Sequence, residues 1–343
     1  MHEQLSGPVH ALLLQKHLTR DEAAACVGAI MDGLCEPVDI AAFLTAMSAK
    51  GPVSNEVVGA AMAMRARASR IPSLRSPLLD TCGTGGDRLH TFNISTATAL
   101  VAAACGVNVA KHGNRSVSSS SGSADVLESL GVNISLTAAQ AGQCLDQTGI
   151  AFCFAPMLHG AMKHAAPVRR QLGFPTIFNL LGPLTNPAQA SYQLIGASSV
   201  DRAELLAHAI CQLGVRKAIV VCGNNELDEV CLWGPTRVFV VSNNTVHQHE
   251  WTANDFGLPP CRVESIRVHS AAESAAMIRK VLSFEQCAAT DMVVANTAAA
   301  LIACEFTDDL SHAVTIVRNA LQSNSAQAIL DQLIRVTNEL ATP

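Results

Sequence analysis

A glycine-rich segment with hydroxyl donors follows an apolar run near residue 80. It reads Asp80-Thr81-Cys82-Gly83-Thr84-Gly85-Gly86-Asp87, and Asn93-Ile94-Ser95-Thr96 follows just before a helix predicted from Ala97. Glycines let the backbone turn tightly and bring N–H groups close to an anion, and a helix N-terminus favours phosphate. The spacing matches neither a dinucleotide fingerprint nor a Walker loop. An ordinary glycine-rich turn is therefore the alternative to a phosphate site.

A second polar segment runs from Lys111 to Ser123, after a strand predicted at 107–110. It combines two cations, an imidazole, an amide and a run of serines, and a helix is predicted to follow at 124–130. A solvated surface loop would explain the polarity but not the placement. Two strand–loop–helix units at the same edge of a parallel sheet place both loops where α/β proteins bind ligands. The two loops together predict a polyanion site.

Two further groups suit a phosphorylated substrate with a carboxylate-bearing partner. Asp228-Glu229 follows a strand predicted at 218–222, and carboxylates beside substrate phosphates are typical Mg²⁺ ligands. Taken alone, the pair could equally be a solvated surface pair. Arg169-Arg170 suits a carboxylate through its forked guanidinium, although Arg170 could lie on a helix surface. His159 and His164 could be structural histidines.

The elements that must position these residues fall into two parts. The first seventy residues predict three helices: one after a Thr19/Glu22 capping box that ends by Gly33, one at 40–48, and one after Ser54. A larger domain or a second subunit must cover their apolar faces. Beyond residue 72 the pattern alternates between strand and helix, which predicts an α/β domain with a mostly parallel sheet. The predicted strands are 78–80, 107–110, 150–154, 176–178, 193–195, 218–222 and 237–241, and further helices are 201–212 and 271–282.

Composition excludes several classes of protein. The chain has 343 residues, of which 49% are hydrophobic and 15% charged, so it has enough apolar material for a folded core. A net charge of -5 and 4% aromatic residues disfavour a nucleic-acid partner. The twelve cysteines contain no C-x-x-C pair, which favours free thiols in a reducing compartment and a cytoplasmic location. No signal peptide is recognised, and the longest apolar run, 99–110, is too short to cross a membrane.

The motifs, in their order and spacing, resemble the anthranilate phosphoribosyltransferase family. The segments that carry the resemblance are GTGGD, NIST, KHGNRSVSSSSGSADVLE, and the stretch from PVRR to NLLGPLTNPA. The resemblance implies the α/β fold of nucleoside phosphorylases and class II phosphoribosyltransferases. A small N-terminal helical domain, residues 1–70 joined by part of 160–190, would precede a larger α/β domain at 71–343 with a mostly parallel central sheet. A homodimer through the helical part is also implied.

The implied reaction is transfer of the phosphoribosyl group of phosphoribosyl pyrophosphate to the amine of anthranilate, with Mg²⁺, in tryptophan biosynthesis. By resemblance, Ser95, Asp228 and Glu229 would bind the metal. Gly83, Asn114 and Arg169 would contact anthranilate, with His112 and Gly182 nearby. The residues expected to bind phosphoribosyl pyrophosphate are Gly83, Gly86, Asp87, Thr91, Asn93, Ile94, Ser95, Thr96, Lys111, His112, Gly113, Asn114, Arg115, Ser116, Val117, Ser118, Ser119 and Ser123.

No general base is expected, because the amine of anthranilate is already a neutral nucleophile. Arg169 and His112 would position the substrates. The sequence departs from the family pattern at Gly160, at Asn224-Asn225 before the acidic pair, and at Cys231. Two alternatives are a pyrimidine nucleoside phosphorylase, which shares the architecture, and a paralogue that has lost the transferase and binds nucleic acid. The intact GTGGD and Asp228-Glu229 motifs and the negative net charge disfavour the second.

Overall fold

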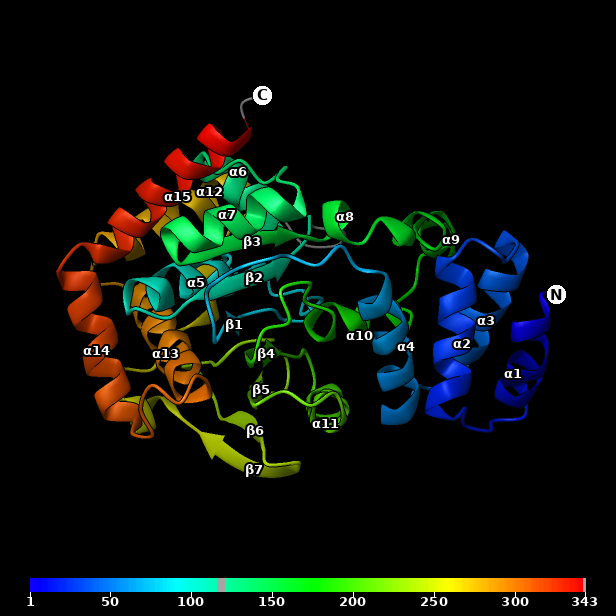
Figure 1. Cartoon of the computed structure of the whole chain (residues 1–343). Coiled ribbons are helices and arrows are strands. Elements are labelled where there is room, and N and C mark those ends of the chain that lie inside the picture. The colour runs from blue at the N-terminus through cyan, green and yellow to red at the C-terminus, as the bar shows by residue number, and fades with distance from the viewer. Residues whose placement is uncertain (116–120, 342–343) are drawn as a thin grey trace.

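The computed structural model describes residues 1–115 and 121–341, and its centre is a seven-stranded sheet (Figure 1). The strand order is β3-β2-β1-β4-β5-β6-β7. The first five strands run parallel, while β6 and β7 are antiparallel additions at one edge. The mostly parallel sheet is therefore confirmed. The strands are β1 (Leu79–Asp80), β2 (Val109–Gly113), β3 (Ile150–Phe154), β4 (Tyr192–Gly196), β5 (Lys217–Gly223), β6 (Thr236–Ser242) and β7 (Thr245–Trp251).

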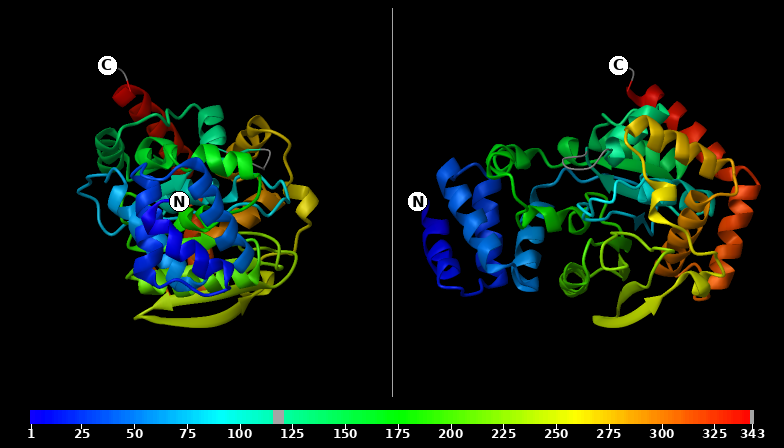
Figure 2. Two further views of the ribbon diagram at one scale, coloured as in Figure 1. Left: turned by 90° about the vertical axis from the view of Figure 1, so that its right-hand side faces the viewer. Right: turned by 180° about the vertical axis from the view of Figure 1, so that it is seen from behind.

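Helices surround the sheet and form a separate group at the N-terminal end (Figures 1 and 2). That group consists of α1 (Glu3–Leu13), α2 (Arg20–Met31), α3 (Pro37–Lys50) and α4 (Ser54–Arg67). The others are α5 (Ile94–Ala104), α6 (Ser123–Leu130), α7 (Ala138–Thr148), α8 (Ala155–Leu158), α9 (Ala166–Leu172), α10 (Phe178–Leu181), α11 (Val200–Gln212), α12 (Ala271–Leu282), α13 (Ala288–Ala303), α14 (Leu310–Gln322) and α15 (Ser325–Ala341). Short 3-10 turns lie at η1 (Gly160–Lys163), η2 (Gly182–Leu184), η3 (Ala253–Phe256) and η4 (Val263–Ile266).

Local signals account for the N-terminal helices. The capping box predicted for α2 is present: the N–H of Glu22 donates to Thr19 Oγ1, and Thr19 N–H donates to Glu22 Oε2 at 2.8 Å. Pro37 stands in the first turn of α3, where its missing N–H costs nothing. The three predicted helices are confirmed, and α1 precedes them. Their apolar faces are covered by α9, α10 and α11, so the covering elements come from the same chain.

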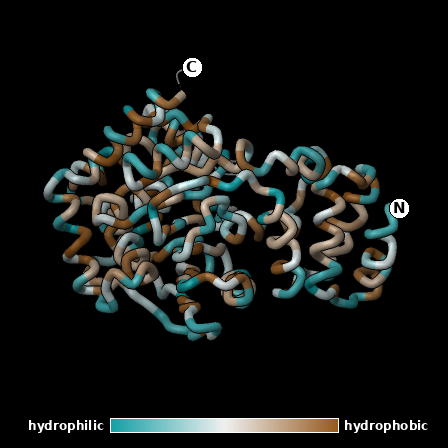
Figure 3. The backbone as a smooth tube through the Cα atoms, viewed as in Figure 1, coloured by the Kyte–Doolittle hydropathy of each residue, from teal (hydrophilic) through white to brown (hydrophobic). Residues whose placement is uncertain are grey.

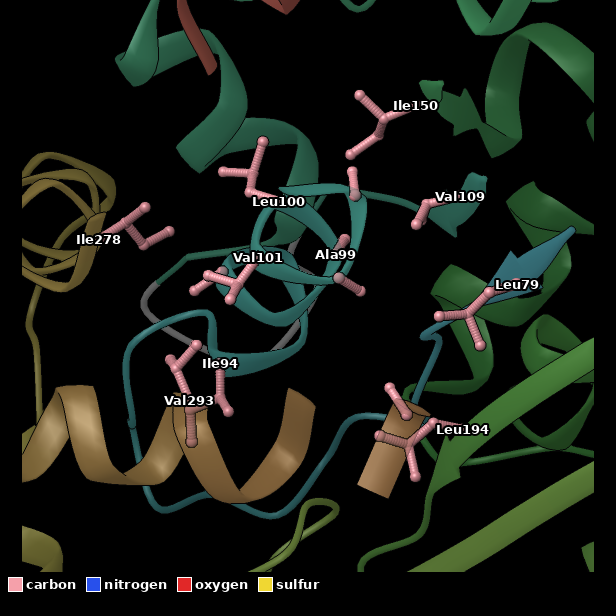
Figure 4. Close-up of a cluster of buried hydrophobic side chains, with 14 of the residues drawn as sticks. Leu79, Ile94, Ala99, Leu100, Val101, Val109, Ile150, Leu194, Ile278 and Val293 are labelled. Atoms are coloured by element: carbon pink, nitrogen blue, oxygen red, sulfur yellow. The ribbon is translucent and has the colours of Figure 1, made fainter. Parts of the chain in front are cut away.

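The two faces of the sheet belong to two different cores. Side chains alternate along a strand, so Leu194 and Ile195 of β4 point to opposite sides. Leu194 joins Leu79 and the residues of α5, α12 and α13, and Figure 4 shows this cluster around α5. Ile195 joins α11 and the N-terminal helices. The outer helices α14 and α15 alternate between hydrophobic and hydrophilic positions, as a one-sided contact requires (Figure 3).

Three sequence-based expectations need correction. The strand predicted at 176–178 is wrong: Thr176 N–H donates to Asn179 Oδ1 at 2.9 Å, and this turn leads into α10. The second strand extends to Gly113, since Lys111, His112 and Gly113 pair with β3, so these residues are not in a loop. Helix α5 begins three residues before Ala97. The antiparallel partner of β6 was not foreseen, although Asn243 and Asn244 with positive φ form its two-residue turn.

The cysteines and the helices bear on two other expectations. All twelve cysteines are free, and six are buried: Cys26, Cys82, Cys144, Cys153, Cys222 and Cys231. Among the described residues, no helix combines the length and apolar character needed to cross a membrane.

Candidate active site

The loop after β1 meets the loop after β5. Gly85 N–H donates to Asp228 Oδ2 at 2.7 Å, and Thr84 N–H donates to the carbonyl of Gly196 at 2.9 Å. A methyl group at Gly83 would lie only 2.6 Å from Asp228 Oδ2. This close approach favours glycine at position 83, because a side chain there would displace the Asp228 carboxylate. The glycine-rich segment and the acidic pair, 143 residues apart in sequence, thus form one site.

Three carboxyl groups of this site, those of Asp87, Asp228 and Glu229, have raised pKa values. Burial, followed by the neighbouring Asp87 charge, raises the pKa of Asp228. Burial and the Asp228 charge raise the pKa of Glu229 well above its usual range, against the opposing effect of the Lys111 ammonium. Burial also raises the pKa of Asp87. Carboxylates with raised pKa values at one place are suited to a divalent cation, whose charge would favour their ionised forms.

Ser95 lies beside the acidic pair. Its backbone lowers the pKa of the Glu229 carboxyl, and its Oγ accepts from Lys111 Nζ at 3.2 Å. The three residues expected to bind the metal therefore lie near one another. Oxygen ligands of this kind fit Mg²⁺, which prefers one or two carboxylates and takes its remaining ligands from substrate and water.

Another group could bind a metal by distance alone. Ligand atoms of Asp80, Cys82 and His112 lie within 4.8 Å of one another, and all three residues are buried. Burial raises the pKa of the Cys82 thiol, and a protonated thiol beside an imidazole is a poor ligand set for a hard cation that prefers oxygen. The oxygen-rich group at Asp228 suits a hard divalent cation better.

Lys111 is the buried cation of the site. It is 3% exposed, and its ammonium donates to the carbonyl of Thr81 at 2.6 Å as well as to Ser95 Oγ. A buried ammonium needs both hydrogen bonds and nearby negative charge. The carboxylates of Asp80 and Glu229 supply that charge. Lys111 therefore links β2 to the loop after β1 and balances the acidic residues.

His112 faces the other side of β2 and is neutral. Its backbone N–H donates to Asp80 Oδ1 at 3.0 Å, and its Nδ1 donates to the carbonyl of Gly182 at 2.9 Å. Its ring lies 5.1 Å from that of His159, centroid to centroid. Burial lowers the pKa of His112 to about 3 and that of His159 to about 4. His112 Nε2 and both ring nitrogens of His159 are buried and have no hydrogen-bond partner among the residues that the structure describes.

The segment after β2 is partly paired within the protein. The Arg115 guanidinium bonds to Glu128 through both terminal nitrogens and to Asp125 Oδ1 at 3.0 Å. The carbonyl of Asn114 accepts from Ser123 Oγ at 3.2 Å, which joins the two ends of the loop. Arg115 would have to exchange these carboxylates for a phosphate to bind one. Ser116, Val117, Ser118 and Ser119 lie outside the described residues.

Arg169 lies on α9 beside the polar turn that precedes α10. Its Nη2 donates to Asn179 Oδ1 at 3.4 Å, and its guanidinium stacks 5.3 Å from the ring centre of Phe178. Burial lowers its pKa. The neighbouring Arg170 is exposed. A long hydrogen bond and a stacked plane leave the guanidinium fork available for a carboxylate.

The remaining residues that are expected to bind phosphoribosyl pyrophosphate have buried side chains or offer only their backbone. Ile94 and Thr96 are each 1% exposed, in the first turn of α5. Thr91 pairs through its backbone with Arg267. Gly86 is exposed with a φ of +84°. Gly113 ends β2, with no room for a side chain beside Ser123 Oγ.

Several residues that shape the site escaped the sequence analysis. Asn296 of α13 clamps the residue after Glu229: its Oδ1 accepts from Val230 N–H at 2.9 Å, and its Nδ2 donates to the Val230 carbonyl at 3.0 Å. Gly196 must be glycine, because a methyl group there would lie 1.6 Å from the carbonyl oxygen of Asp228. Ser274 of α12 donates to Asn93 Oδ1 at 2.7 Å. For Gly196, its place directly after the strand predicted at 193–195 was the local signal.

The departures from the family pattern have local explanations. Asn224 and Asn225 both adopt positive φ, so they make the tight turn before the acidic pair. The thiol of Cys231 donates to the carbonyl of Gly234 at 3.2 Å, as a hydroxyl group at this position would. A methyl group at Gly160 would meet no atom of the described residues within 4 Å, so no close contact with them requires glycine there.

Known proteins match the chain over nearly all of its length. Residues 9–68 match the glycosyl transferase family, helical bundle domain, and residues 75–327 match the glycosyl transferase family, a/b domain. Anthranilate phosphoribosyltransferase of Chromobacterium violaceum is 45% identical over 97% of this chain and 97% of its own. That of Herpetosiphon aurantiacus is 46% identical over 98% of this chain and 99% of its own. The chain belongs to the anthranilate phosphoribosyltransferase family.

Solved structures agree with this membership. The crystal structure of anthranilate phosphoribosyltransferase from Thermus thermophilus is 38% identical and covers 96% of this chain and 99% of its own, with a TM-score of 0.91. The Saccharomyces cerevisiae enzyme, solved in complex with PRPP and Mg, shares the fold at 23% identity and a TM-score of 0.90, covering 98% of this chain and 100% of its own. The fold expected from the family resemblance is confirmed.

Proposed function

We propose that the chain is an anthranilate phosphoribosyltransferase of tryptophan biosynthesis. It transfers the phosphoribosyl group of phosphoribosyl pyrophosphate to the amine of anthranilate and releases pyrophosphate. The observation that carries the proposal is the meeting of three loops at one edge of the parallel sheet. Gly85 on the first contacts Asp228 on the third, and Lys111 joins the first to β2, which leads into the second. Family membership supports the same activity.

The bond changes balance without a general base. The anthranilate nitrogen forms a bond to the anomeric carbon as the bond from that carbon to pyrophosphate oxygen breaks. The amine then loses one proton to solvent. Negative charge grows on the leaving group, and hydrogen-bond donors fixed before the reaction stabilise it at the lowest cost. The backbone N–H of the exposed Gly86 and the hydroxyl of Ser95 in the first turn of α5 are such donors.

The residues expected around anthranilate would position this substrate for the reaction. Arg169 would hold the carboxylate of anthranilate, and the neutral His112 and Asn114 would border the ring. Correct placement of two reactants is worth several orders of magnitude in rate. The raised pKa values of Asp228 and Glu229, together with the adjoining Ser95, support a Mg²⁺ site at these three residues. When bound, Mg²⁺ supplies positive charge that stabilises the departing pyrophosphate.

Loss of anthranilate fluorescence in the presence of phosphoribosyl pyrophosphate and Mg²⁺ tests the proposal. We expect rapid loss with the parent protein and little with Asp228→Ala plus Glu229→Ala. A matched control is Asp331→Ala, since this acidic residue is exposed on α15. If the parent protein binds phosphoribosyl pyrophosphate but consumes no anthranilate at any concentration, the proposed acceptor is wrong. Other aromatic amines and free bases would then be tested.

We propose a homodimer that forms through the helical part. Six of the exposed large hydrophobic residues, Met1, Leu13, Leu14, Leu34, Val38 and Met62, lie within the first seventy residues. Exposed apolar side chains gathered on one part of a protein favour association.

We further propose that a helical domain, 1–70 with part of 160–190, is distinct from the α/β domain at 71–343. Free cysteines support a cytoplasmic location.

A further inference from the structure

The turn η2 (Gly182–Leu184) accepts a side-chain hydrogen bond at each of its three carbonyl groups, and we call it the carbonyl turn. Its first carbonyl accepts from His112 Nδ1 at 2.9 Å, its second from Gln193 Nε2 at 2.6 Å, and its third from Arg65 Nε at 2.6 Å. The last carbonyls of a helical segment have no partner within it, so they need donors from elsewhere. Here the donors come from β2, β4 and α4, which lie far apart in the chain.

The carbonyl turn fixes which tautomer His112 adopts. A carbonyl oxygen only accepts hydrogen bonds, so the Nδ1 that contacts Gly182 must carry the hydrogen. The ring is neutral because burial lowers its pKa, and its Nε2 therefore keeps a lone pair. A shift of the Gly182 carbonyl would alter the orientation of this ring and the nitrogen that carries its hydrogen.

Arg65 connects the carbonyl turn to the helical part of the chain. Its helix, α4, packs against α10, which leads directly into the turn (Figure 1). The guanidinium is half-buried, and burial lowers its pKa without an opposing effect from any carboxylate of the described residues. Arginine side chains are rarely buried unless they are paired, and here the partner is the carbonyl of Leu184.

Two amide side chains hold the same segment to the sheet. Gln193 is 2% exposed, and it lies opposite Asp80 where β4 pairs with β1. Asn186 Nδ2 donates to the carbonyl of Ala110 at 2.7 Å, two residues before His112 in β2. The segment after α10 is therefore held by α4, β4 and β2 at once.

We propose that Arg65 and Gln193 are positioning residues that act through the carbonyl turn on His112, and thereby set the affinity for anthranilate. This inference rests on the proposed function. Neither residue belongs to the motifs that carry the family resemblance. Loss of either donor leaves a carbonyl group without its partner, so the turn shifts and the Gly182 carbonyl moves away from His112.

Arg65→Met and Gln193→Met test the proposal, because methionine keeps most of the length of each side chain and removes the donor. The KM for anthranilate should rise roughly fivefold in each variant, the effect of one lost hydrogen bond. The KM for phosphoribosyl pyrophosphate should stay within about twofold, since among the described residues no hydrogen bond joins the carbonyl turn to the glycine-rich loop or the acidic pair. A substitution that only destabilises the fold would not separate the two KM values.

Arg279→Met is the matched control. Arg279 also donates to a backbone carbonyl, that of Leu130 at 3.2 Å, but this contact joins α12 to the end of α6. Its loss should leave both KM values unchanged.

The double variant Arg65→Met plus Gln193→Met shows whether both donors act on one turn. Its KM for anthranilate should rise by less than the product of the two single effects, because the second substitution acts on a turn that has already shifted. An unchanged KM for anthranilate in either single variant, an equal rise in both KM values, or a fully multiplicative double variant would overturn the proposal.

The tautomer of His112 separates failure of the carbonyl turn from failure of the proposed function. Nitrogen NMR spectra of protein with isotope-labelled histidine give separate signals for Nδ1 and Nε2, and His112→Gln assigns those of His112. The ligand-free parent protein should carry the hydrogen on Nδ1, whereas Arg65→Met and Gln193→Met should share it between the two nitrogens. Arg279→Met should match the parent protein.

If the parent protein consumes no anthranilate, the proposed function fails and the claim on affinity falls with it. The spectra then decide the carbonyl turn by themselves. Changed His112 signals in both variants support its positioning role, and unchanged signals in either variant overturn it.

Discussion

At the scale of the residue, two adjacent arginines face different surroundings. Arg169 is partly buried against Phe178, whereas Arg170 is exposed. Arg169→Ala should raise the KM for anthranilate at least about 30-fold, since truncating one partner of a desolvated charge pair costs 2 kcal/mol or more. The KM for phosphoribosyl pyrophosphate should not change. Steady-state fluorescence kinetics measure both constants, and Arg170→Ala should match the parent protein. Equal effects of the two substitutions would contradict the assignment of Arg169.

His159 makes stability depend on pH. Burial lowers its pKa from 6.5 to about 4, so the folded protein keeps it neutral where the unfolded chain protonates it. The contribution to stability is complete above pH 6.5 and falls as the pH drops toward 4. Between pH 7.5 and 5.0 the parent protein should lose about 2 kcal/mol more free energy of unfolding than His159→Gln. Urea unfolding at both pH values measures the difference.

The control for this pH effect is His249→Gln, because His249 is exposed on β7. It should follow the parent protein at both pH values. If His159→Gln loses as much stability as the parent between pH 7.5 and 5.0, the imidazole is not held neutral in the folded state.

At the scale of the element, the loop after β1 and the loop after β5 meet where position 83 has no side chain. Gly83→Ala places a methyl group 2.6 Å from Asp228 Oδ2, so this carboxylate must move from its present position. We expect kcat/KM to fall at least about 100-fold, the loss that a displacement of about 1 Å can produce at a reacting centre. The far-ultraviolet circular dichroism spectrum should not change, because no helix or strand is interrupted.

Gly7→Ala is the matched control for Gly83→Ala. Gly7 lies inside α1, and a methyl group there meets nothing within 4 Å. This substitution should leave activity unchanged and raise stability by up to about 1 kcal/mol, since alanine is the better helix former. Full activity in Gly83→Ala would show that the contact with Asp228 is not needed for turnover.

At the scale of the whole molecule, the proposed dimer depends on apolar side chains of the helical part. Val38 on α3 is 72% exposed. Val38→Glu should convert dimer to monomer at micromolar protein concentration, because an unpaired carboxylate would be buried at the interface. Sedimentation velocity measures the change. Leu74→Glu, at a 93% exposed residue outside the first seventy, should leave the sedimentation coefficient of the parent protein unchanged. A monomeric parent protein would contradict the dimer itself.

Local sequence patterns predicted most elements of the fold, and the errors have physical causes. The predicted strand at 150–154 and the predicted helix at 271–282 match the structure at both ends, because apolar periodicity and caps are local. The short apolar run at 176–178 forms a turn instead, since Asn179 accepts the Thr176 N–H. Lys111 and His112 read as loop residues by polarity, yet they are buried in β2 because partners from other segments satisfy them.

The sequence by itself identified the residues that we propose to carry the chemistry: the glycine-rich loop, the lysine segment, the acidic pair and Arg169. It also determined that strand and helix alternate, which places such loops at one edge of a parallel sheet. Only the tertiary structure decided which partners these residues have. The Gly85–Asp228 contact, the ring of His159 beside His112, and the Ser274 bonds to Asn93 join segments far apart in the chain. Propensity and periodicity act over a few residues, whereas contacts between distant segments depend on how the whole chain packs.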